Sequence, residues 1–183
     1  MVAGYKGKMP YTLRKKGDMA SRRWDGEEIR SRLAALGYEL HPVLAPARVS
    51  EFERKFAVEL PGSYRSFITE VGNGGAGPFH GLWELDRSYE QKYEDWMPGF
   101  LATPFPYVEA VGPDNLGDDY DEDEIVTGSM IISDIGCGSF VRLIVTGATK
   151  GQVWFDHTAI NDTLEPGPDF HDWYSSWLQS LHR

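Results

Sequence analysis

The chain has only one cysteine, Cys137, and no long apolar run in its 183 residues. A single cysteine cannot form a disulfide within the chain, which favours a reducing compartment. No stretch approaches the roughly 18 apolar residues that a membrane span needs, so no membrane association is expected. The basic residues near the N-terminus have no apolar segment after them, which argues against a secretory signal. The sequence therefore predicts a cytoplasmic protein.

Basic residues are scarce beyond the first 23 positions. Residues 1–23 hold seven Lys and Arg against one Asp, about +6, whereas the other 160 residues hold eleven against twenty-seven acidic residues, which is −16. We interpret 1–23 as a basic, disordered leader and 24–183 as a single domain. A body of this charge repels nucleic acid and attracts basic partners, so no nucleic-acid partner is expected.

Apolar periodicity predicts three helices in the first half. They are expected at 25–36, from Pro46 to about 56, and from Pro61 to 71, because apolar residues recur there at i, i+3 or i+4, and i+7. Asp25 is typical of a helix cap, and Pro46 and Pro61 of a first helical turn. Ser50 and Glu53 match the spacing of a capping box, which leaves a later start of the second helix open.

The second half reads mainly as strands. One strand is expected at 79–85, followed by a long irregular insert at 86–128 with a possible helix at 89–96. Strands are then expected at 130–135, 140–146 and 152–156, and an amphipathic helix at 170–181, with Trp173 and Trp177 on its buried face. This order indicates an α+β fold, with a mixed or antiparallel sheet flanked by N-terminal helices and a C-terminal amphipathic helix.

Two motifs resemble ligand sites but lack the required context. Residues 72–77 spell G-x-G-x-x-G, yet a helix precedes them and a strand-like run follows, which favours a tight turn over nucleotide binding. Asp119, Asp121 and Asp123 match the first, third and fifth positions of a calcium-binding loop. Its sixth position should be Gly and is Glu124, so a solvated acidic loop is favoured.

No arrangement of residues predicts catalysis. His157 is the one candidate base for Cys137, and a turn cysteine packed as a small hydrophobic residue is the favoured interpretation. The five histidines lack metal-ligand spacing, so we expect neither a metal nor a cofactor. Acidic pairs leave an unrecognised hydrolase open. Trp154 is interpreted as a core aromatic, with a place in a binding groove as the alternative.

Several segments together resemble the SUKH superfamily, the domains similar to the yeast cell-wall assembly regulator. The first half contributes Phe52-Glu53 with Phe56, Leu60-Pro61-x-x-Tyr64-x-x-Phe67-Ile68, Asn73-Gly74-Gly75 and Gly81-Leu82. The second half contributes Ile131-Ile132-Ser133-Asp134-x-Gly136-x-Gly138, Gly147 and Gly151-x-Val153-Trp154. The resemblance covers about 24–183, except for the insert at 86–128, where nothing aligns.

The resemblance implies a non-catalytic protein-binding domain. Bacterial members look like immunity proteins that bind and neutralise a cognate polymorphic toxin, and eukaryotic relatives are regulatory adaptors. A basic toxin, such as a nuclease with a positive cleft, would suit the acidic body. The expected partner-binding residues are the acidic stretch with its aromatic residue, and the tryptophan near the end of the sheet: Asp118, Asp119, Tyr120, Asp121, Glu122, Asp123, Glu124 and Trp154.

Overall fold

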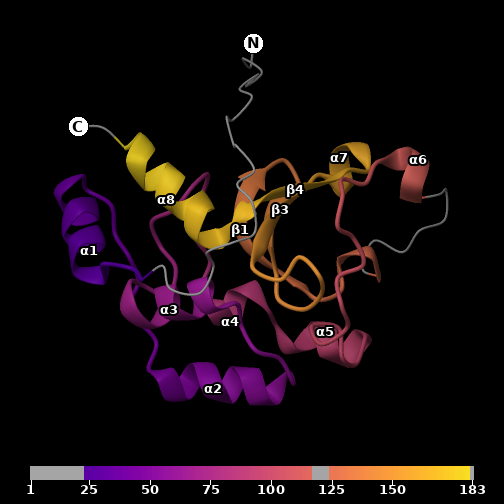
Figure 1. Ribbon diagram of the computed structural model, residues 1–183, viewed down its shortest axis with the longest axis horizontal. Coiled ribbons are helices and arrows are strands. Elements are labelled where there is room, and N and C mark those ends of the chain that lie inside the picture. Colours follow the sequence, from indigo (N-terminus) through magenta and orange to yellow (C-terminus); the bar gives the residue numbers. More distant parts are fainter. Residues whose placement is uncertain (1–22, 117–123, 182–183) are drawn as a thin grey trace, which may run out of the picture.

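The first three helices lie where the apolar periodicity predicts them. They are α1 (Gly26–Ala35), α2 (Pro46–Lys55) and α3 (Gly62–Glu70) in the computed structural model, which describes residues 23–116 and 124–181 (Figure 1). Asp25 caps α1 by accepting a hydrogen bond from Glu28 N at 2.9 Å. Because α2 begins at Pro46, the alternative start at the capping-box pair Ser50 and Glu53 is wrong.

The strands form one antiparallel sheet in the order β1-β2-β3-β4. The first three, β1 (Ser129–Gly136), β2 (Ser139–Ile144) and β3 (Gln152–Asp156), confirm the expected neighbours. The fourth, β4 (Leu164–Asp169), was not predicted, because Pro166 and Pro168 interrupt any strand pattern there. Proline is tolerated at a sheet edge, where its missing N–H breaks no ladder. Val111 exchanges two 2.9 Å backbone hydrogen bonds with Leu164 on the outer side of β4.

The strand expected at 79–85 is wrong. Only Leu82 pairs there, with Gly75 on one side and Ser133 of β1 on the other. The preceding residues form a tight turn, and the chain then enters the one-turn helix α4 (Leu85–Ser88). The apolar residues of this stretch therefore reach the core from a turn and a helix. A short apolar run in the sequence does not distinguish these elements from a strand.

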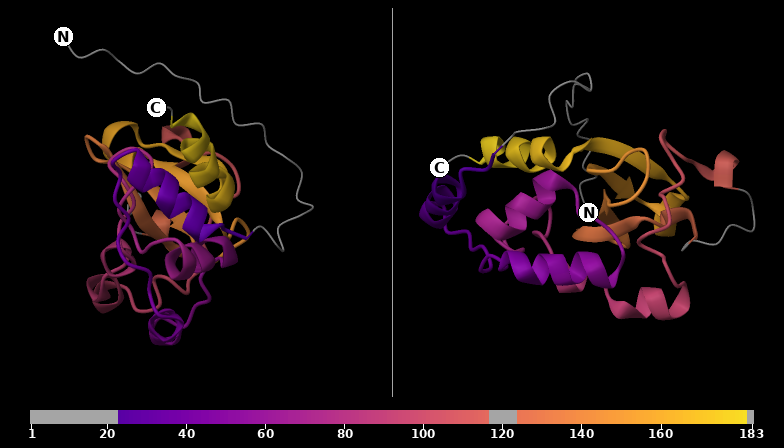
Figure 2. Two further views of the ribbon diagram at one scale, coloured as in Figure 1. Left: turned by 90° about the vertical axis from the view of Figure 1, so that its left-hand side faces the viewer. Right: turned by 60° about the horizontal axis from the view of Figure 1, so that its bottom comes forward.

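The long insert contains short helices. The helix expected at 89–96 is confirmed as α5 (Gln91–Trp96), and α6 (Pro113–Leu116) and the 3₁₀ helix η1 (Glu124–Val126) lie beyond it. One more short helix, α7 (Thr158–Asn161), connects β3 to β4. In Figures 1 and 2, α6 and α7 lie at the same end of the molecule, away from α1.

The last helix, α8 (Phe170–Ser180), continues from β4 and packs on α3. Its aromatic rings join those of Trp24 and Phe67, with centroids 4.5–6.2 Å apart. Trp173 is 1% exposed, as expected for a core residue. Trp177 is partly buried and packs against the core and the ring of the exposed Tyr38, which agrees with the expectation that it is mostly buried.

The glycine-rich segment after α3 is a structural turn. Gly74 and Gly75 have φ of +92° and +93°, which glycine adopts without steric cost. A Cβ on Gly75 would lie 2.6 Å from the carbonyl oxygen of Glu39, so the backbones approach too closely for any side chain. The turn therefore pairs through Gly75 with the segments of Leu40 and Leu82. It follows α3, whereas a nucleotide-binding loop follows a strand.

Candidate partner-binding site

The expected acidic binding stretch lies mostly outside the described residues. Its positions Asp118, Asp119, Tyr120, Asp121, Glu122 and Asp123 fall in 117–123, and Glu124 opens η1 with an exposed side chain. Both flanking segments are attached to the body. On one side Val111 pairs with β4, and on the other Ile125 and Val126 are buried in the core. The described residues on both sides of the acidic stretch are therefore attached to the sheet or to the core.

Trp154 lies in the core and presents no surface to a partner, so its expected role as a binding-groove aromatic is wrong. Its side chain is fully buried, and its ring meets that of Phe105 edge-on at 4.9 Å. On β3 it stands between Arg142 of β2 and Pro166 of β4. Because β4 pairs with the outer side of β3, Trp154 lies on an inner strand of the sheet.

A buried ion pair joins β2 to β3 beside Trp154. Arg142 Nε donates to a carboxylate oxygen of Asp156, and the two side chains are 13% and 3% exposed. The other oxygen of Asp156 accepts from the backbone N and the hydroxyl of Thr158, at 3.1 and 2.6 Å. Asp156 therefore fixes the first turn of α7 as well as the strand pair.

Opposing effects act on the pKa of Asp156. Burial raises it, but the charge of Arg142 and the hydrogen bonds from Thr158 and Arg142 favour the carboxylate more strongly. The net result is a pKa below the ordinary value of 3.8. The carboxylate is therefore charged in the folded protein at neutral pH, as the salt bridge requires.

Cys137 is exposed at the tip of the β1–β2 hairpin, so the expectation that it packs as a small hydrophobic residue is wrong. The hairpin has a two-residue loop, Cys137 and Gly138, with φ of +56° and +84°. Two positive φ angles indicate a type I′ turn. The expected candidate base, His157, has its Nδ1 2.7 Å from Oγ of Ser139, a side chain that is buried and closed to a substrate.

We expect Cys137→Asn to raise the free energy of unfolding by roughly 0.5 kcal/mol, because asparagine before glycine is favoured in a type I′ turn. Cys137→Ser, the control, should leave it unchanged within about 0.5 kcal/mol, since the thiol is exposed. Urea unfolding of the three proteins measures both effects. A lower stability for the Asn variant would contradict the turn assignment.

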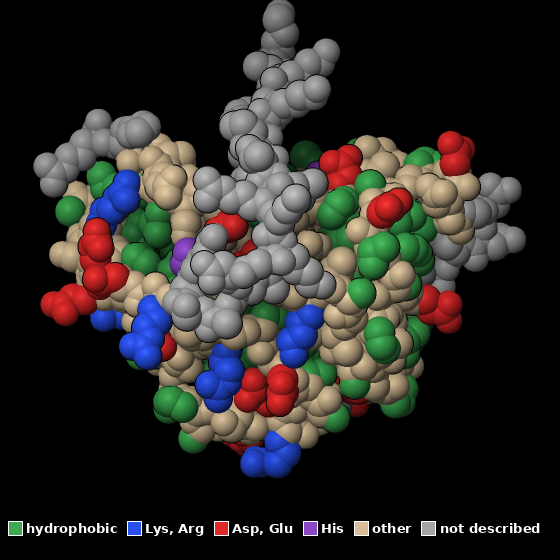
Figure 3. Space-filling model, viewed as in Figure 1, with side chains coloured by type: hydrophobic (Ala, Val, Ile, Leu, Met, Phe, Trp, Pro, Cys, Tyr) green, Lys and Arg blue, Asp and Glu red, His purple; other side chains and the backbone are tan. Residues whose placement is uncertain are grey.

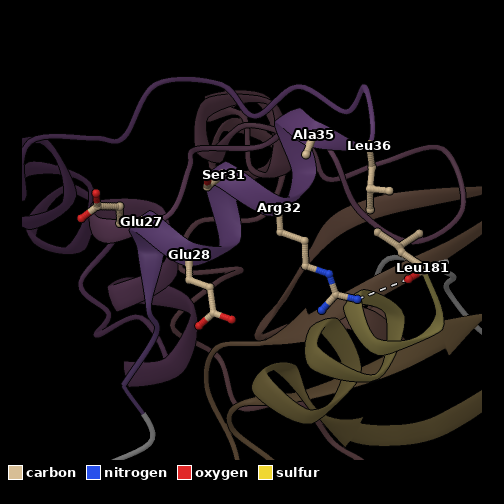
Figure 4. A pocket seen from close by; sticks show the side chains of 7 residues that line it. All are labelled: Glu27, Glu28, Ser31, Arg32, Ala35, Leu36 and Leu181. Carbon is tan, nitrogen blue, oxygen red and sulfur yellow. Dashed lines mark hydrogen bonds between the residues drawn. The ribbon is translucent and has the colours of Figure 1, made fainter. Parts of the chain in front are cut away.

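The surface of the described residues includes the following two hollows. The larger, about 740 Å³, lies between α1 and the end of α8 and is open and polar (Figure 4). Arg32 crosses it and donates to the carbonyls of Leu178 and Leu181 at 2.7 and 3.3 Å, so this charge caps the last turn of α8. The smaller, about 330 Å³, lies between α2 and the residues around Tyr89. Neither is the enclosed, mainly apolar pocket typical of small-molecule sites.

Charge divides the molecule into two halves. From Tyr93 to Leu181 the sequence holds sixteen acidic residues against two basic ones, Arg142 and Lys150. Arg142 is neutralised in its buried pair, which leaves Lys150 as the exposed Lys or Arg of this half. In Figure 3 the Lys and Arg side chains gather over the helical half together with Asp and Glu, whereas hydrophobic and acidic side chains cover the half over the strands.

The comparison with protein families identifies the domain. A model described as the SMI1 / KNR4 family (SUKH-1) matches residues 44–176, from just before α2 into α8. The chain belongs to this family. Neither a curated protein nor a solved structure matches it. Membership in SUKH-1 confirms the resemblance to the SUKH superfamily and agrees with the α+β fold.

The SUKH-1 match covers most of the described elements. The sheet, α3 and the buried pair of Arg142 and Asp156 lie inside 44–176, whereas α1 and the end of α8, which form the larger hollow, lie outside. Among the described residues, no group of three or more His, Cys, Asp or Glu could hold a metal ion. No helix in the described parts of this SUKH-1 chain is long and apolar enough to cross a membrane.

Proposed function

We propose that this SUKH-1 protein is a cytoplasmic, non-catalytic binding protein that neutralises a basic toxin of the nuclease class. The observation that carries the proposal is the charge of the sheet half. This half has one exposed Lys, Lys150, and sixteen acidic residues. A nuclease holds phosphates in a positive cleft, and carboxylates presented by an inhibitor can occupy the same field.

The acidic stretch suits this role because of its sequence, in which six of the seven residues from Asp118 to Glu124 are acidic. The described segments on either side, from Val111 to Leu116 and from Glu124 to Ser129, are tied to β4 and to the core. Carboxylates presented to a basic cleft favour binding, because the potentials of the two surfaces are then complementary. Complementary charge also accelerates the encounter of the two proteins.

The test uses the protein encoded by the reading frame next to that of this chain. Co-expression should restore growth of cells that this product kills, and the two purified proteins should bind. Changing Asp119, Asp121, Asp123 and Glu124 to their amides should lower the association rate about tenfold at low salt and less at high salt. Stopped-flow mixing at two salt concentrations measures both rates.

A matched control separates local from overall charge. Amides at Glu27, Glu28, Glu51 and Asp86 remove the same charge from exposed positions in the helical half. This control should lower the association rate much less than the acidic-stretch variant. Equal effects would contradict docking through the acidic stretch. A neighbouring product that neither binds nor is toxic would contradict the immunity function and leave the adaptor role.

A further inference from the structure

Backbone strain gathers at one end of the sheet. Four non-glycine residues of the described chain have positive φ, and three of them, Phe79, Cys137 and Asp162, lie at this end, with φ of +56°, +56° and +54°. Cys137 is at the β1–β2 hairpin tip, and Asp162 caps the C-terminus of α7. Non-glycine residues in left-handed conformations persist where the surrounding structure holds them, and they cluster at functional sites.

Direct contacts join the three strained turns into one surface. His80, next to Phe79, donates its backbone N–H to the carbonyl of Asp134 on β1 at 3.2 Å. At the hairpin tip, a Cβ on Gly138 would lie 3.3 Å from Cβ of Ala159 on α7. The hairpin tip therefore lies between the turn that holds Phe79 and α7. We call the exposed residues Phe79, His80, Cys137 and Ile160 the Phe79 surface.

Phe79 is the most unusual residue of this surface. It is the second residue of the turn Pro78–Gly81, which is closed by a 3.0 Å hydrogen bond from Gly81 N to the carbonyl of Pro78. A left-handed backbone costs a non-glycine residue about 1–2 kcal/mol, and a bulky residue there is a true outlier. The ring is 42% exposed, so burial in the core does not fully offset this cost.

The turn holds its aromatic ring in a fixed place. Ser133 Oγ, which is buried, donates to the carbonyl of Pro78 at 3.2 Å, and the next backbone N–H pairs with β1. A ring on a turn that is fixed from both sides loses little freedom on binding. Such pre-organised aromatic residues are typical of the centres of protein interfaces.

The chemistry of the surface indicates its partner. Besides Phe79, it exposes Ile160, which is 57% accessible, and Ile135 within its segment 133–139 is half-buried. The segments that form it, 77–82, 133–139 and 156–163, contain the partly exposed Asp134 and Asp162 and no Lys or Arg, and their third acid, Asp156, is buried against Arg142. An apolar patch with acidic surroundings complements an apolar pocket bordered by basic side chains.

We propose that the Phe79 surface is a docking site for a basic protein partner, which receives the Phe79 ring in an apolar pocket bordered by Lys or Arg. The inference rests on the proposed function, because the partner is the basic toxin named there. It adds a second contact region, formed by described residues at the end of the sheet.

The first test measures the free protein. Phe79→Gly should leave the midpoint of thermal unfolding unchanged or higher, because glycine takes the left-handed backbone without strain. Phe79→Asn keeps a residue that tolerates this conformation and guards against a turn loosened by glycine. A fall of more than about 4 °C in both variants would show that the ring supports the fold, and would overturn the proposal.

The second test measures binding to the purified product of the neighbouring reading frame by isothermal titration calorimetry. Both Phe79 variants should bind at least tenfold more weakly than the unaltered protein. Val43→Asn is the control, since Val43 is 44% exposed and lies away from the sheet end, before α2. It should bind normally.

The outcomes separate the two proposals. Unchanged affinity of the Phe79 variants would overturn the docking site and leave the immunity function intact. Absence of binding by the unaltered protein would overturn both. Self-association of the unaltered protein that Phe79→Gly abolishes would assign the surface to a second copy of this chain, and would also overturn the proposal.

Discussion

Replacing Asp156 by Ala is expected to lower the free energy of unfolding by about 3–5 kcal/mol, because it leaves the guanidinium of Arg142 buried without its partner. It also removes the acceptor for the backbone N–H and hydroxyl of Thr158. Urea unfolding measures the loss. The exposed pair of Arg48 and Asp86, 3.7 Å apart, provides the control, and Asp86→Ala should cost less than about 1 kcal/mol.

A double variant shows whether the pair itself stabilises the sheet. Arg142→Met with Asp156→Leu removes both charges and keeps side-chain volume, so most of the lost stability should return. If the double variant is as unstable as Asp156→Ala, the contacts with Thr158 carry the effect, and the uncompensated charge of Arg142 does not.

The same pair predicts a dependence on pH. The pKa of Asp156 is lower in the folded protein than its ordinary value of 3.8, so its ionisation stabilises the fold at pH values above 3.8. This contribution is lost as the pH falls from there through the folded pKa. The stability difference between the unaltered protein and Asp156→Asn should therefore shrink in acid, and a constant difference from pH 7 to pH 2 would contradict the assignment.

Trp173→Ala is expected to lower the free energy of unfolding by about 3–5 kcal/mol, the usual cost of removing a large buried aromatic side chain. Its ring is 1% exposed and contacts Phe170. Trp177, one turn later on α8, is the matched control, because it is only partly buried and lies against the exposed Tyr38. Trp177→Ala should cost about half as much. Equal losses would mean that Tyr38 and Trp177 form part of the core in solution.

Local signals were sufficient for most of the helices and three strands. Asp25 and Pro46 mark helix starts by their own chemistry, and the apolar period of α8 follows from its contact with α3. The prolines at 166 and 168 concealed β4, since proline is unfavourable in a strand except at an edge. Whether a strand lies at an edge depends on its neighbours, which its own sequence does not specify.

The burial of Trp154 confirms its interpretation as a core aromatic, and its place among the expected partner-binding residues is wrong. The burial of a strand residue depends on the neighbouring strands, and β4, whose Pro166 pairs with Trp154, was not predicted. The ion pair of Arg142 and Asp156 escaped prediction for a related reason, since it depends on the register between β2 and β3. Phe79 was assigned to a strand, because nothing in its residue type indicates a left-handed backbone.

Both edges of the sheet are closed to further strands. At β1, Trp83 and His80 already donate to the carbonyls of Ile132 and Asp134. At β4, the backbone N–H and carbonyl of Leu164 are already bonded to Val111. Pro166 and Pro168 have no N–H that could donate to a further strand. These contacts and prolines hinder another chain from extending the sheet at either edge. A partner must be recognised by its side chains, so a few substitutions in either protein could change which pairs recognise each other while the fold stays the same.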